Sequence, residues 1–255
     1  KLPPAMQAKV DAETGYTDEL MIMSEVYRLW AIESDSKKVL DTLSFSKADE
    51  GVIITADIDL FRELKLRLLN GSHTFNCGLA WLAGFRTVKE AAGNADFSVY
   101  LNHLMMQEIA PAITNPGLSM EAAREFADKV QERFRNPHIE HQWLSITMQY
   151  SSKMKLRNIP IIQNYLDRFD TVPECITLGF AAHLLFMKCE KGSDGKFYGE
   201  ANGEKYLVND DNAGWYAEKW QQAGNIPQLT QRILGDETFW GMNFDAHTVF
   251  VNAIS

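Results

Sequence analysis

The stretch Leu60–Ala83, LFRELKLRLLNGSHTFNCGLAWLA, decides how this sequence folds. Its apolar positions Leu60, Leu64 and Leu68 recur every four residues, a spacing that places them on one face of an α-helix. Gly84 follows directly and is typical of a helix end. We therefore predict one long helix over this stretch.

Comparable apolar stripes predict further helices along the chain. Thr87 and Glu90 form a capping-box pattern before one of them, and Ser119 is a candidate N-cap before another. Such stripes are typical of helices that pack one face against a core. The stripe residues are Phe97, Leu101 and Leu104; Ala123, Phe126, Val130 and Phe134; and Ile176, Phe180, Leu184 and Met187.

Short strands are predicted at only a few places. Tyr27–Glu33 and Val52–Ala56 contain β-prone residues. Asn202-Gly203, between Phe197 and Val208, is typical of a two-residue hairpin turn. No repeat or linker divides the chain, and no alternation of strands and helices indicates a parallel sheet. We predict a mainly α-helical single domain with a few short strands and a β-hairpin.

Composition narrows the classes of partner. The chain of 255 residues has a formal net charge of −9 and no dense run of Lys and Arg, so no nucleic-acid partner is expected. The longest apolar stretch, Ile176–Met187, is too short to span a bilayer, so no membrane partner is expected. Cys77, Cys175 and Cys189 lack CxxC spacing, which favours a reducing cytoplasm over disulfides or a structural zinc site.

Three polar residues interrupt the long apolar helix. Lys65, His73 and Asn70 would lie at roughly 0°, 80° and 140° around an ideal helix, so one flank could present all three to a cleft. Gly71 beside them weakens the helix by roughly 1 kcal/mol relative to Ala and often marks close approach to another group. Because buried polar groups are costly without partners, this flank is a candidate functional site.

These three side chains suit the oxidation of an alcohol. A lysine partly withdrawn from water can act as a general base and take the alcohol proton as hydride leaves the same carbon. The Asn70 amide could donate to the developing oxyanion, and a neutral His73 could orient the substrate hydroxyl. From the residues alone a structural interpretation stays open, with Lys65 solvated, Asn70 a local cap and His73 a core histidine.

A resemblance to a known family favours the functional interpretation. Lysine, four residues, asparagine, two residues and histidine form the signature of the polyol-specific long-chain dehydrogenases, the mannitol dehydrogenase family. Lys65, Asn70 and His73 match this signature. The strings LRLLNGSHTFNCGLAWLAGFRTVKEA and RFRNPHIEHQWLSI, the latter from Arg133 to Ile146, resemble the tagaturonate reductase branch of that family.

The resemblance implies a fold, an activity and a cofactor. It extends from about Tyr16 to the Gly235-Asp236 region. Residues 1–255 would form the C-terminal substrate and catalytic domain, similar in fold to the C-terminal domain of 6-phosphogluconate dehydrogenase. Lys65 would be the general base, the asparagine and histidine of the signature would bind the reacting oxygen, and no metal would take part. The reaction would be the NAD-dependent interconversion of tagaturonate and altronate.

The resemblance also implies a second domain. Family members place an N-terminal Rossmann domain before the helical domain, with the active site in the cleft between them and a further oxyanion-stabilising asparagine on the Rossmann side. This sequence has no Gly-x-Gly-x-x-Gly fingerprint, so we predict no cofactor-binding residue in this chain and expect NAD to bind mainly to that other domain. Because the catalytic signature is complete while a cofactor site is missing, we expect roughly 200 or more residues before Lys1, and an inactive isolated chain.

A basic segment before Pro160 supplies a candidate anion site. Pro160 suits the first turn of a helix and biases Ile159 away from helical geometry, so the residues before it are predicted to be extended. There Lys153, Lys155 and Arg157 would share one side. A solvated basic strand stays open as the alternative. By resemblance this stretch aligns with the family's substrate-binding loop, and Arg157 or Lys153 would bind the carboxylate of tagaturonate or altronate.

Other features of the sequence suggest a metal site, a nucleophilic cysteine or a different function. His138 and His141 lie near Glu140, but no third convincing ligand accompanies them, so no metal site is predicted. Cys77 follows His73 by one turn, but small buried thiols are common and inert. A helical module that docks a partner protein, or a fructuronate reductase or mannitol dehydrogenase of the same family, would also fit. The basic segment argues against the neutral polyol mannitol.

Overall fold

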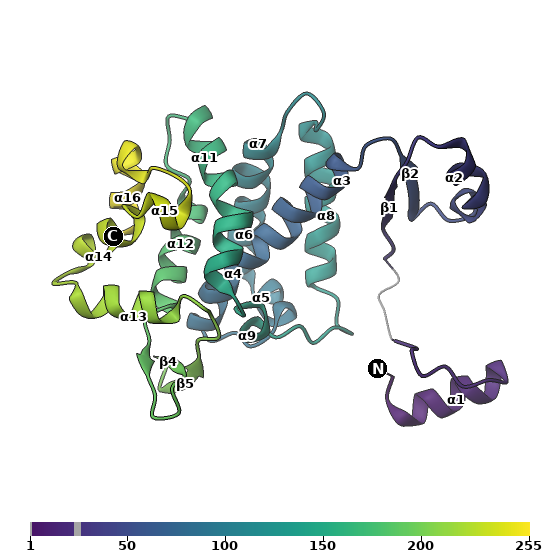
Figure 1. The fold of residues 1–255 in the computed structure, drawn as a ribbon, viewed down its shortest axis with the longest axis horizontal. Coiled ribbons are helices and arrows are strands. Elements are labelled where there is room, and N and C mark those ends of the chain that lie inside the picture. Colours follow the sequence, from purple (N-terminus) through teal and green to yellow (C-terminus); the bar gives the residue numbers. More distant parts are fainter. Residues whose placement is uncertain (1, 23–26) are drawn as a thin grey trace. The chain divides into compact units, whose positions relative to one another are not determined.

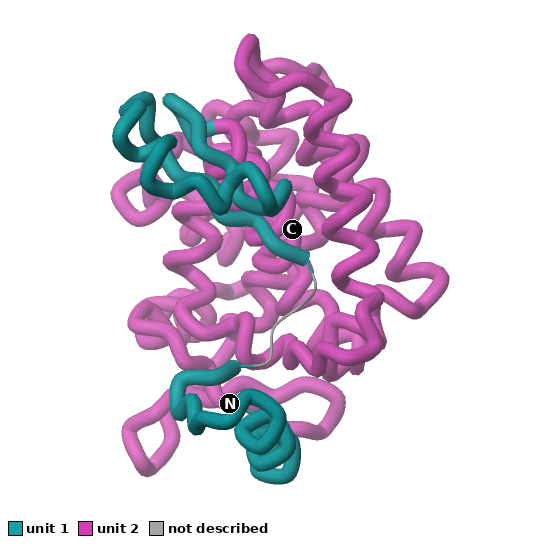
Figure 2. Tube along the Cα trace, turned by 90° about the vertical axis from the view of Figure 1, so that its right-hand side faces the viewer, with its two compact units in different colours: residues 1–59 teal, residues 60–255 magenta. Residues whose placement is uncertain are grey.

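The chain divides into two compact units in a computed structural model that describes residues 2–22 and 27–255. Unit 1 comprises residues 1–59 and unit 2 comprises residues 60–255 (Figure 2). The predicted fold class is confirmed, because the structure is mainly helical and contains two small sheets among the described residues. Nothing in the composition of the sequence marks the boundary between the units.

Unit 1 contains a small strand–helix–strand motif. Strands β1 (Trp30–Glu33) and β2 (Val52–Thr55) pair in parallel, with Trp30 opposite Val52. Both predicted strands are confirmed within shorter bounds, but the expectation that strands and helices do not alternate was wrong here. The connecting helix is too short to show an apolar period. The other elements of unit 1 are α1 (Pro4–Thr14), α2 (Lys37–Thr42) and the 3₁₀ turn η1 (Ser44–Lys47).

Unit 1 has no interior of its own. None of its described residues, 2–22 and 27–59, is buried. Large apolar side chains face solvent instead, with 87% of Leu20, 69% of Ile22 and 57% of Trp30 exposed. Trp30 stacks on Phe45 at a ring-centroid distance of 5.9 Å, which covers only part of the tryptophan. The apolar side chains of this unit therefore lack the cover that a folded domain normally provides.

Unit 2 is a helical body around a large apolar core. No described helix combines the length and the apolar composition needed to cross a membrane. Its α-helices are α3 (Asp59–Glu63, which starts at the last residue of unit 1), α4 (Ser72–Leu82), α5 (Val88–Gly93), α6 (Ala95–His103), α7 (Ala110–Ile113), α8 (Met120–Phe134), α9 (Trp143–Ile146), α10 (Tyr150–Lys153), α11 (Ile159–Arg168), α12 (Glu174–Phe186), α13 (Ala213–Gln222), α14 (Ile226–Leu234), α15 (Glu237–Trp240) and α16 (Thr248–Ile254). Its π-helical segments are η2 (Leu64–Gly71), η3 (Leu104–Ile109) and η4 (Met154–Asn158), and η5 (Phe244–His247) is a 3₁₀ turn.

Within unit 2 the helices α13 to α16 gather at one end of the body (Figure 1). The local signals of the sequence are confirmed here. Thr87 and Glu90 form the reciprocal capping box of α5, and the Ser119 hydroxyl caps α8. Asn202 and Gly203, with φ of 55° and 76°, form the predicted hairpin turn. The antiparallel sheet consists, in order, of β3 (Glu190–Lys191), β4 (Phe197–Ala201) and β5 (Glu204–Leu207).

The predicted long helix from Leu60 to Ala83 is confirmed, with a change of geometry inside it. α3, η2 and α4 follow one another without a break, and the helix ends before Gly84, whose φ is 95°. Within η2 the backbone is π-helical, so each N–H bonds five residues back instead of four. Apolar periodicity could not reveal this, because η2 still buries Leu64, Leu68 and Leu69.

Helices α4 and α12 pack at close range through two glycines. A Cβ at Gly78 would lie 3.2 Å from the Ala182 carbonyl oxygen, and a Cβ at Gly179 would lie 3.0 Å from Phe75 Cβ. Larger residues would force the two helices apart. The Tyr150 hydroxyl of α10 accepts a hydrogen bond from the Gly78 N–H at 3.2 Å and joins the same contact. This packing holds α4, which continues the helix that carries the predicted catalytic residues.

The prediction of an extended segment before Pro160 was wrong. α10, η4 and α11 form one continuous helix over residues 150–168, and Ile159 has helical φ and ψ of −54° and −45°. The proline is tolerated because Arg67, from η2, donates to two carbonyl oxygens of η4 at 2.8 and 2.9 Å. A contact between helices therefore overrides the local bias that a proline imposes.

Candidate functional site

The predicted catalytic residues lie on the helix formed by α3, η2 and α4. Lys65 and Asn70 belong to η2, and His73 lies in the first turn of α4. On a regular α-helix Lys65 and Asn70 would be roughly 140° apart. The i→i+5 hydrogen bonding of a π-helix brings residues five apart toward one face, and π segments are frequent at functional sites. The backbone therefore aligns these two side chains more closely than an α-helix would.

The three side chains differ in their access to solvent. Lys65 is exposed, whereas Asn70 and His73 are partly buried. The Nε2 atom of His73 is itself buried and has no hydrogen-bond partner among the described residues. Unpaired buried ring nitrogens are uncommon because they cost free energy. This atom is therefore a candidate contact for a hydroxyl or carbonyl group.

His73 is held as a neutral ring. It stacks on Phe134 at a centroid distance of 4.3 Å, and Trp143 lies edge-on at 6.0 Å. Burial, and then nearby positive groups, lower the pKa of His73 to about 3. At neutral pH its Nε2 therefore donates or accepts one hydrogen bond, according to the tautomer. The positive groups are His141, Arg157, Arg133 and Lys153.

A second helix brings two cations against the first. Arg157 donates from Nη1 to Thr74 Oγ1 at 3.3 Å, and Thr74 donates in turn to the Asn70 carbonyl oxygen at 2.8 Å. Lys153, one turn earlier, donates from Nζ to the Ile146 carbonyl oxygen at 2.9 Å. Burial lowers the pKa of both cations, and the charge of Arg157 lowers that of Lys153 further. An anion bound here would stabilise both.

Lys155 does not lie with these two cations. Its Nζ donates to the Thr238 carbonyl oxygen at 3.4 Å, in the C-terminal part of the chain. The expectation that Lys153, Lys155 and Arg157 share one side was wrong, because it depended on an extended backbone. On a helix, residues two apart point roughly 200° away from each other, whereas residues four apart share a face. Lys153 and Arg157 therefore stay together, and Lys155 is directed elsewhere.

Sequence reasoning missed Thr74, Arg133 and Trp143 as neighbours of the predicted site. Arg133 and Trp143 lie in one of the strings that carry the family resemblance, which was the available signal. No sequence signal marks Thr74, because its role depends on a hydrogen bond to Arg157, 83 residues away along the chain.

The thiol and the histidine pair considered as alternatives differ in their surroundings. Cys77 is fully buried, and burial raises the pKa of its thiol to about 12, so little thiolate exists at neutral pH. His138 and His141 are exposed, and Glu140 between them forms an ion pair with Lys89 at 3.0 Å. Glu140 is thus engaged by a surface cation.

A different trio has the composition of a metal site. His103, Glu108 and Cys175 have ligand atoms within 4.8 Å of one another. The buried Glu108 carboxylate, however, accepts hydrogen bonds from the Cys175 and Ile176 N–H groups, at 2.8 and 2.7 Å, at the start of α12. Capping of this helix accounts for the carboxylate.

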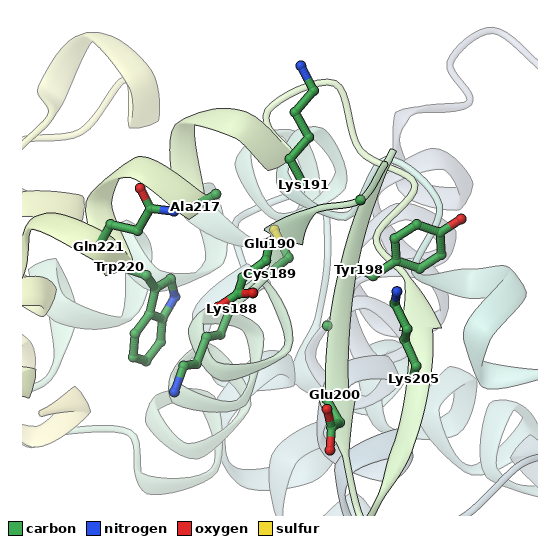
Figure 3. A pocket seen from close by; sticks show the side chains of 12 residues that line it. Lys188, Cys189, Glu190, Lys191, Tyr198, Glu200, Lys205, Ala217, Trp220 and Gln221 are labelled. Carbon is green, nitrogen blue, oxygen red and sulfur yellow. The ribbon is translucent and has the colours of Figure 1, made fainter. Parts of the chain in front are cut away.

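A pocket of about 610 Å³ lies at the β-hairpin (Figure 3). It is bounded by the β3–β4–β5 sheet and by α13, and none of the predicted catalytic or substrate-binding residues lines it. Lys188 Nζ lies 5.2 Å from the Trp220 ring centroid, and Lys205 Nζ lies 4.3 Å from that of Tyr198. These lysines are engaged by aromatic rings, and the pocket is separate from the predicted chemistry.

Comparison with known proteins confirms the family. Residues 57–255 match the family model described as the mannitol dehydrogenase C-terminal domain. The matched part coincides closely with unit 2. The chain therefore belongs to the mannitol dehydrogenase family, of which it carries the C-terminal domain.

Several relatives of the chain have names that specify an activity within this family. Altronate oxidoreductases of Bacillus subtilis (strain 168) and Shigella flexneri are 30% and 33% identical over 240 residues, covering 93% and 91% of this chain. These matches cover 46% and 47% of the relatives, so the chain spans about half their length.

Two solved structures share the fold. Pseudomonas fluorescens mannitol 2-dehydrogenase, in a ternary complex with NAD and D-mannitol, gives a TM-score of 0.72 at 23% identity, over 99% of this chain and 47% of that one. A D-sorbitol dehydrogenase in substrate-free form gives 0.60 at 20% identity, over 100% of this chain and 52% of that one.

Proposed function

We propose that this chain is the substrate and catalytic domain of a cytoplasmic NAD-dependent oxidoreductase that interconverts tagaturonate and altronate. The proposal depends chiefly on one observation: His73, whose buried Nε2 has no partner among the described residues, lies within the electrostatic influence of the partly buried cations Lys153 and Arg157. A neutral hydrogen-bonding group beside two cations suits a substrate that has both a hydroxyl and a carboxylate. The relatives named altronate oxidoreductase support the same substrate class.

The residues of η2 and α4 would act together at the reacting carbon. In the oxidation direction Lys65 takes the hydroxyl proton, while Asn70 and His73 donate hydrogen bonds to the same oxygen. When bound, NAD would supply the acceptor for the hydride of that carbon. In the reduction direction Lys65 returns the proton to the oxygen of the new alcohol.

The cation pair would select the substrate class. The planar Arg157 guanidinium can hold a carboxylate through two hydrogen bonds, and Lys153 adds a second charge. A carboxylate offsets both the desolvation of these cations and their mutual repulsion, whereas a neutral polyol offsets neither. The pair thus favours a uronate over mannitol. Fructuronate carries the same group and is the nearest alternative substrate.

The residues of this site fit the sugar rather than the nucleotide, so we propose that a Rossmann domain of the full-length protein holds most of the cofactor. The exposed surface of unit 1 is consistent with such a further domain. Parallel strands are normally covered on both faces, yet no described residue of unit 1 is buried. Leu20, Ile22 and Trp30 offer apolar surface for such a contact.

Kinetics of the full-length enzyme with NAD(H) test the substrate assignment. We expect Arg157→Ala or Lys153→Ala to raise the Michaelis constant for tagaturonate at least tenfold, equivalent to about 1.4 kcal/mol, because the carboxylate loses a cation. The Michaelis constant for the corresponding neutral ketose should change by less than about twofold.

Lys155→Ala is the matched control, because Lys155 lies two residues from either cation but contacts Thr238. It should leave both Michaelis constants unchanged. Equal, small effects of Arg157→Ala on the uronate and the neutral ketose would move the assignment to a polyol. A strong preference of the wild-type enzyme for fructuronate would move it to that uronate.

A further inference from the structure

Two π-helical segments are braced against each other by a reciprocal pair of side chains. Arg67, in η2, donates from Nη1 to the carbonyl oxygens of Leu156 and Arg157 in η4, at 2.9 and 2.8 Å. In the opposite direction Asn158, in η4, donates from Nδ2 to the Gly71 carbonyl oxygen in η2 at 3.1 Å. Each side chain therefore satisfies backbone carbonyl groups of the other segment.

The local backbone explains why these carbonyl groups need outside donors. Pro160 has no N–H, so the Leu156 carbonyl, four residues earlier, lacks its α-helical partner. At the end of η2, where π bonding gives way to α bonding, the carbonyl oxygens of Asn70 and Gly71 both accept hydrogen bonds from side chains. A carbonyl group that is withdrawn from water without a donor costs free energy, and Arg67 and Asn158 supply donors to these groups.

The side chains of Arg67 and Asn158, which we call the braces, are themselves held in place. Glu63, one turn before Arg67, forms an ion pair with its Nε at 2.9 Å, and the Arg67 side chain is only 13% exposed. Asn158 is fully buried, and its Oδ1 has no partner among the described residues, so its bond to Gly71 orients it. A Cβ at Gly71 would lie 3.1 Å from Ile161 Cδ1, which shows how closely the two helices approach.

We propose that Arg67 and Asn158 are positioning residues that fix the register of η2 against the α10–η4 helix. One helix carries the proton acceptor Lys65, and the other carries the cation pair Lys153 and Arg157. Register between them sets how far the reacting carbon lies from the substrate carboxylate, and misplacement on the scale of 1 Å is costly in catalysis. This inference rests on the function proposed above.

Replacing each brace in the full-length enzyme tests the inference. Asn158→Asp keeps the shape of the side chain and removes the amide donor. Arg67→Lys keeps the charge, but its single nitrogen cannot take the place of both Nε, which pairs with Glu63, and Nη1, which donates to the two carbonyl groups. We expect each variant to lower kcat roughly tenfold and to raise KM for the uronate severalfold, because the proton acceptor and the cation pair move relative to each other.

Amide hydrogen exchange supplies a readout besides activity. Exchange should accelerate mainly in the segment that the missing side chain braced, which is η2 for Asn158→Asp and η4 for Arg67→Lys. If Asn158→Asp does not fold, Asn158→Ala removes the same donor without adding a charge. The double variant should lose less than the product of the two single effects, since both act on one register.

Tyr206→Phe is the matched control. The buried Tyr206 hydroxyl donates to the Phe186 carbonyl oxygen at the end of α12, at 2.9 Å, so this variant also removes a buried donor to a helix carbonyl. It should lower thermal stability while kcat and KM stay within about twofold of wild type. Brace variants that behave in the same way would overturn the inference, even if Lys65→Ala abolishes turnover. Normal turnover of Lys65→Ala would instead overturn the proposed function.

Discussion

Two core helices of this domain each carry a histidine with one buried ring nitrogen that has no partner among the described residues, and only His73 lies among cations. His73 begins α4, and His183 lies in α12. Burial lowers the pKa of each histidine to about 3. A strongly lowered pKa is therefore common to both helices and marks no site by itself.

The surroundings of the two rings differ. His183 Nε2 shares a hydrogen bond with the Tyr216 hydroxyl at 2.9 Å, and its ring packs edge-on against Tyr150 at 4.3 Å. His73 Nε2 has no partner among the described residues, and its ring lies near several cations. Since His183 Nδ1 also lacks a partner among the described residues, the nearby cations rather than the unpaired nitrogen make His73 the candidate contact for a polar substrate.

The backbones differ as well. α12 is a regular α-helix over Glu174–Phe186, and its side chains are largely apolar. The other helix changes to π geometry over Leu64–Gly71, where its polar residues lie. The comparison teaches that the π segment and the nearby cations distinguish the candidate site, and that burial or an unpaired nitrogen alone does not.

The largest expected effect is a loss of turnover on replacing a lysine of the first helix. Lys65→Ala in the full-length enzyme should lower kcat by roughly 10² to 10⁴, the usual loss on removing a general base. Lys188→Ala removes a lysine that follows the end of the comparison helix and should leave kcat unchanged. Steady-state and single-turnover assays measure both. Near-normal turnover in Lys65→Ala would assign this lysine to structure and remove the functional difference between the helices.

A smaller effect on catalysis is expected when either histidine is replaced by phenylalanine. His73→Phe should lower kcat/KM roughly 10²-fold, because the substrate oxygen loses a hydrogen bond, with little change in the free energy of unfolding. His183→Phe leaves the Tyr216 hydroxyl unpaired and should lower the free energy of unfolding by about 1–3 kcal/mol, with kcat/KM nearly unchanged. Steady-state kinetics measures kcat/KM of both variants, and chemical denaturation measures their free energies of unfolding. The reverse pattern would exchange the roles assigned to the two rings.

The smallest effect concerns acid stability, where both histidines should act alike. The unfolded chain binds protons at its histidines near pH 6.5, whereas His73 and His183 in the folded chain bind them only near pH 3. Stability is therefore full above pH 6.5 and is lost as pH falls through this window, by about 2 kcal/mol for the fully buried His183 between pH 6.5 and 5. His73 is partly exposed and should contribute less.

Urea denaturation across that pH range checks this expectation. His183→Gln should flatten the dependence of the free energy of unfolding on pH, and His73→Gln should flatten it to a smaller degree. An unchanged slope in His183→Gln would show that other groups control acid stability.

Local signals of the sequence predicted much of the fold. Apolar spacing located the helix over Leu60–Ala83, the Thr87–Glu90 capping box opened α5, and Asn202-Gly203 formed its hairpin turn. Each depends on residues a few positions apart, so a single sequence contains the information. The spacing of Lys65, Asn70 and His73 likewise placed these residues on one helix and led to the family that the comparisons confirm.

The sequence by itself therefore determined the helical class, the helix that carries the signature and the family. Tertiary structure alone decided the π geometry that aligns Lys65 with Asn70, and the helical backbone that joins Lys153 with Arg157 and turns Lys155 away. The physical reason is that Pro160 leaves the Leu156 carbonyl without its α-helical donor, and Arg67 donates to this group and to the next carbonyl from 89 and 90 residues away. No local propensity contains that information, because the preference imposed by Pro160 is small enough for two hydrogen bonds between helices to reverse it.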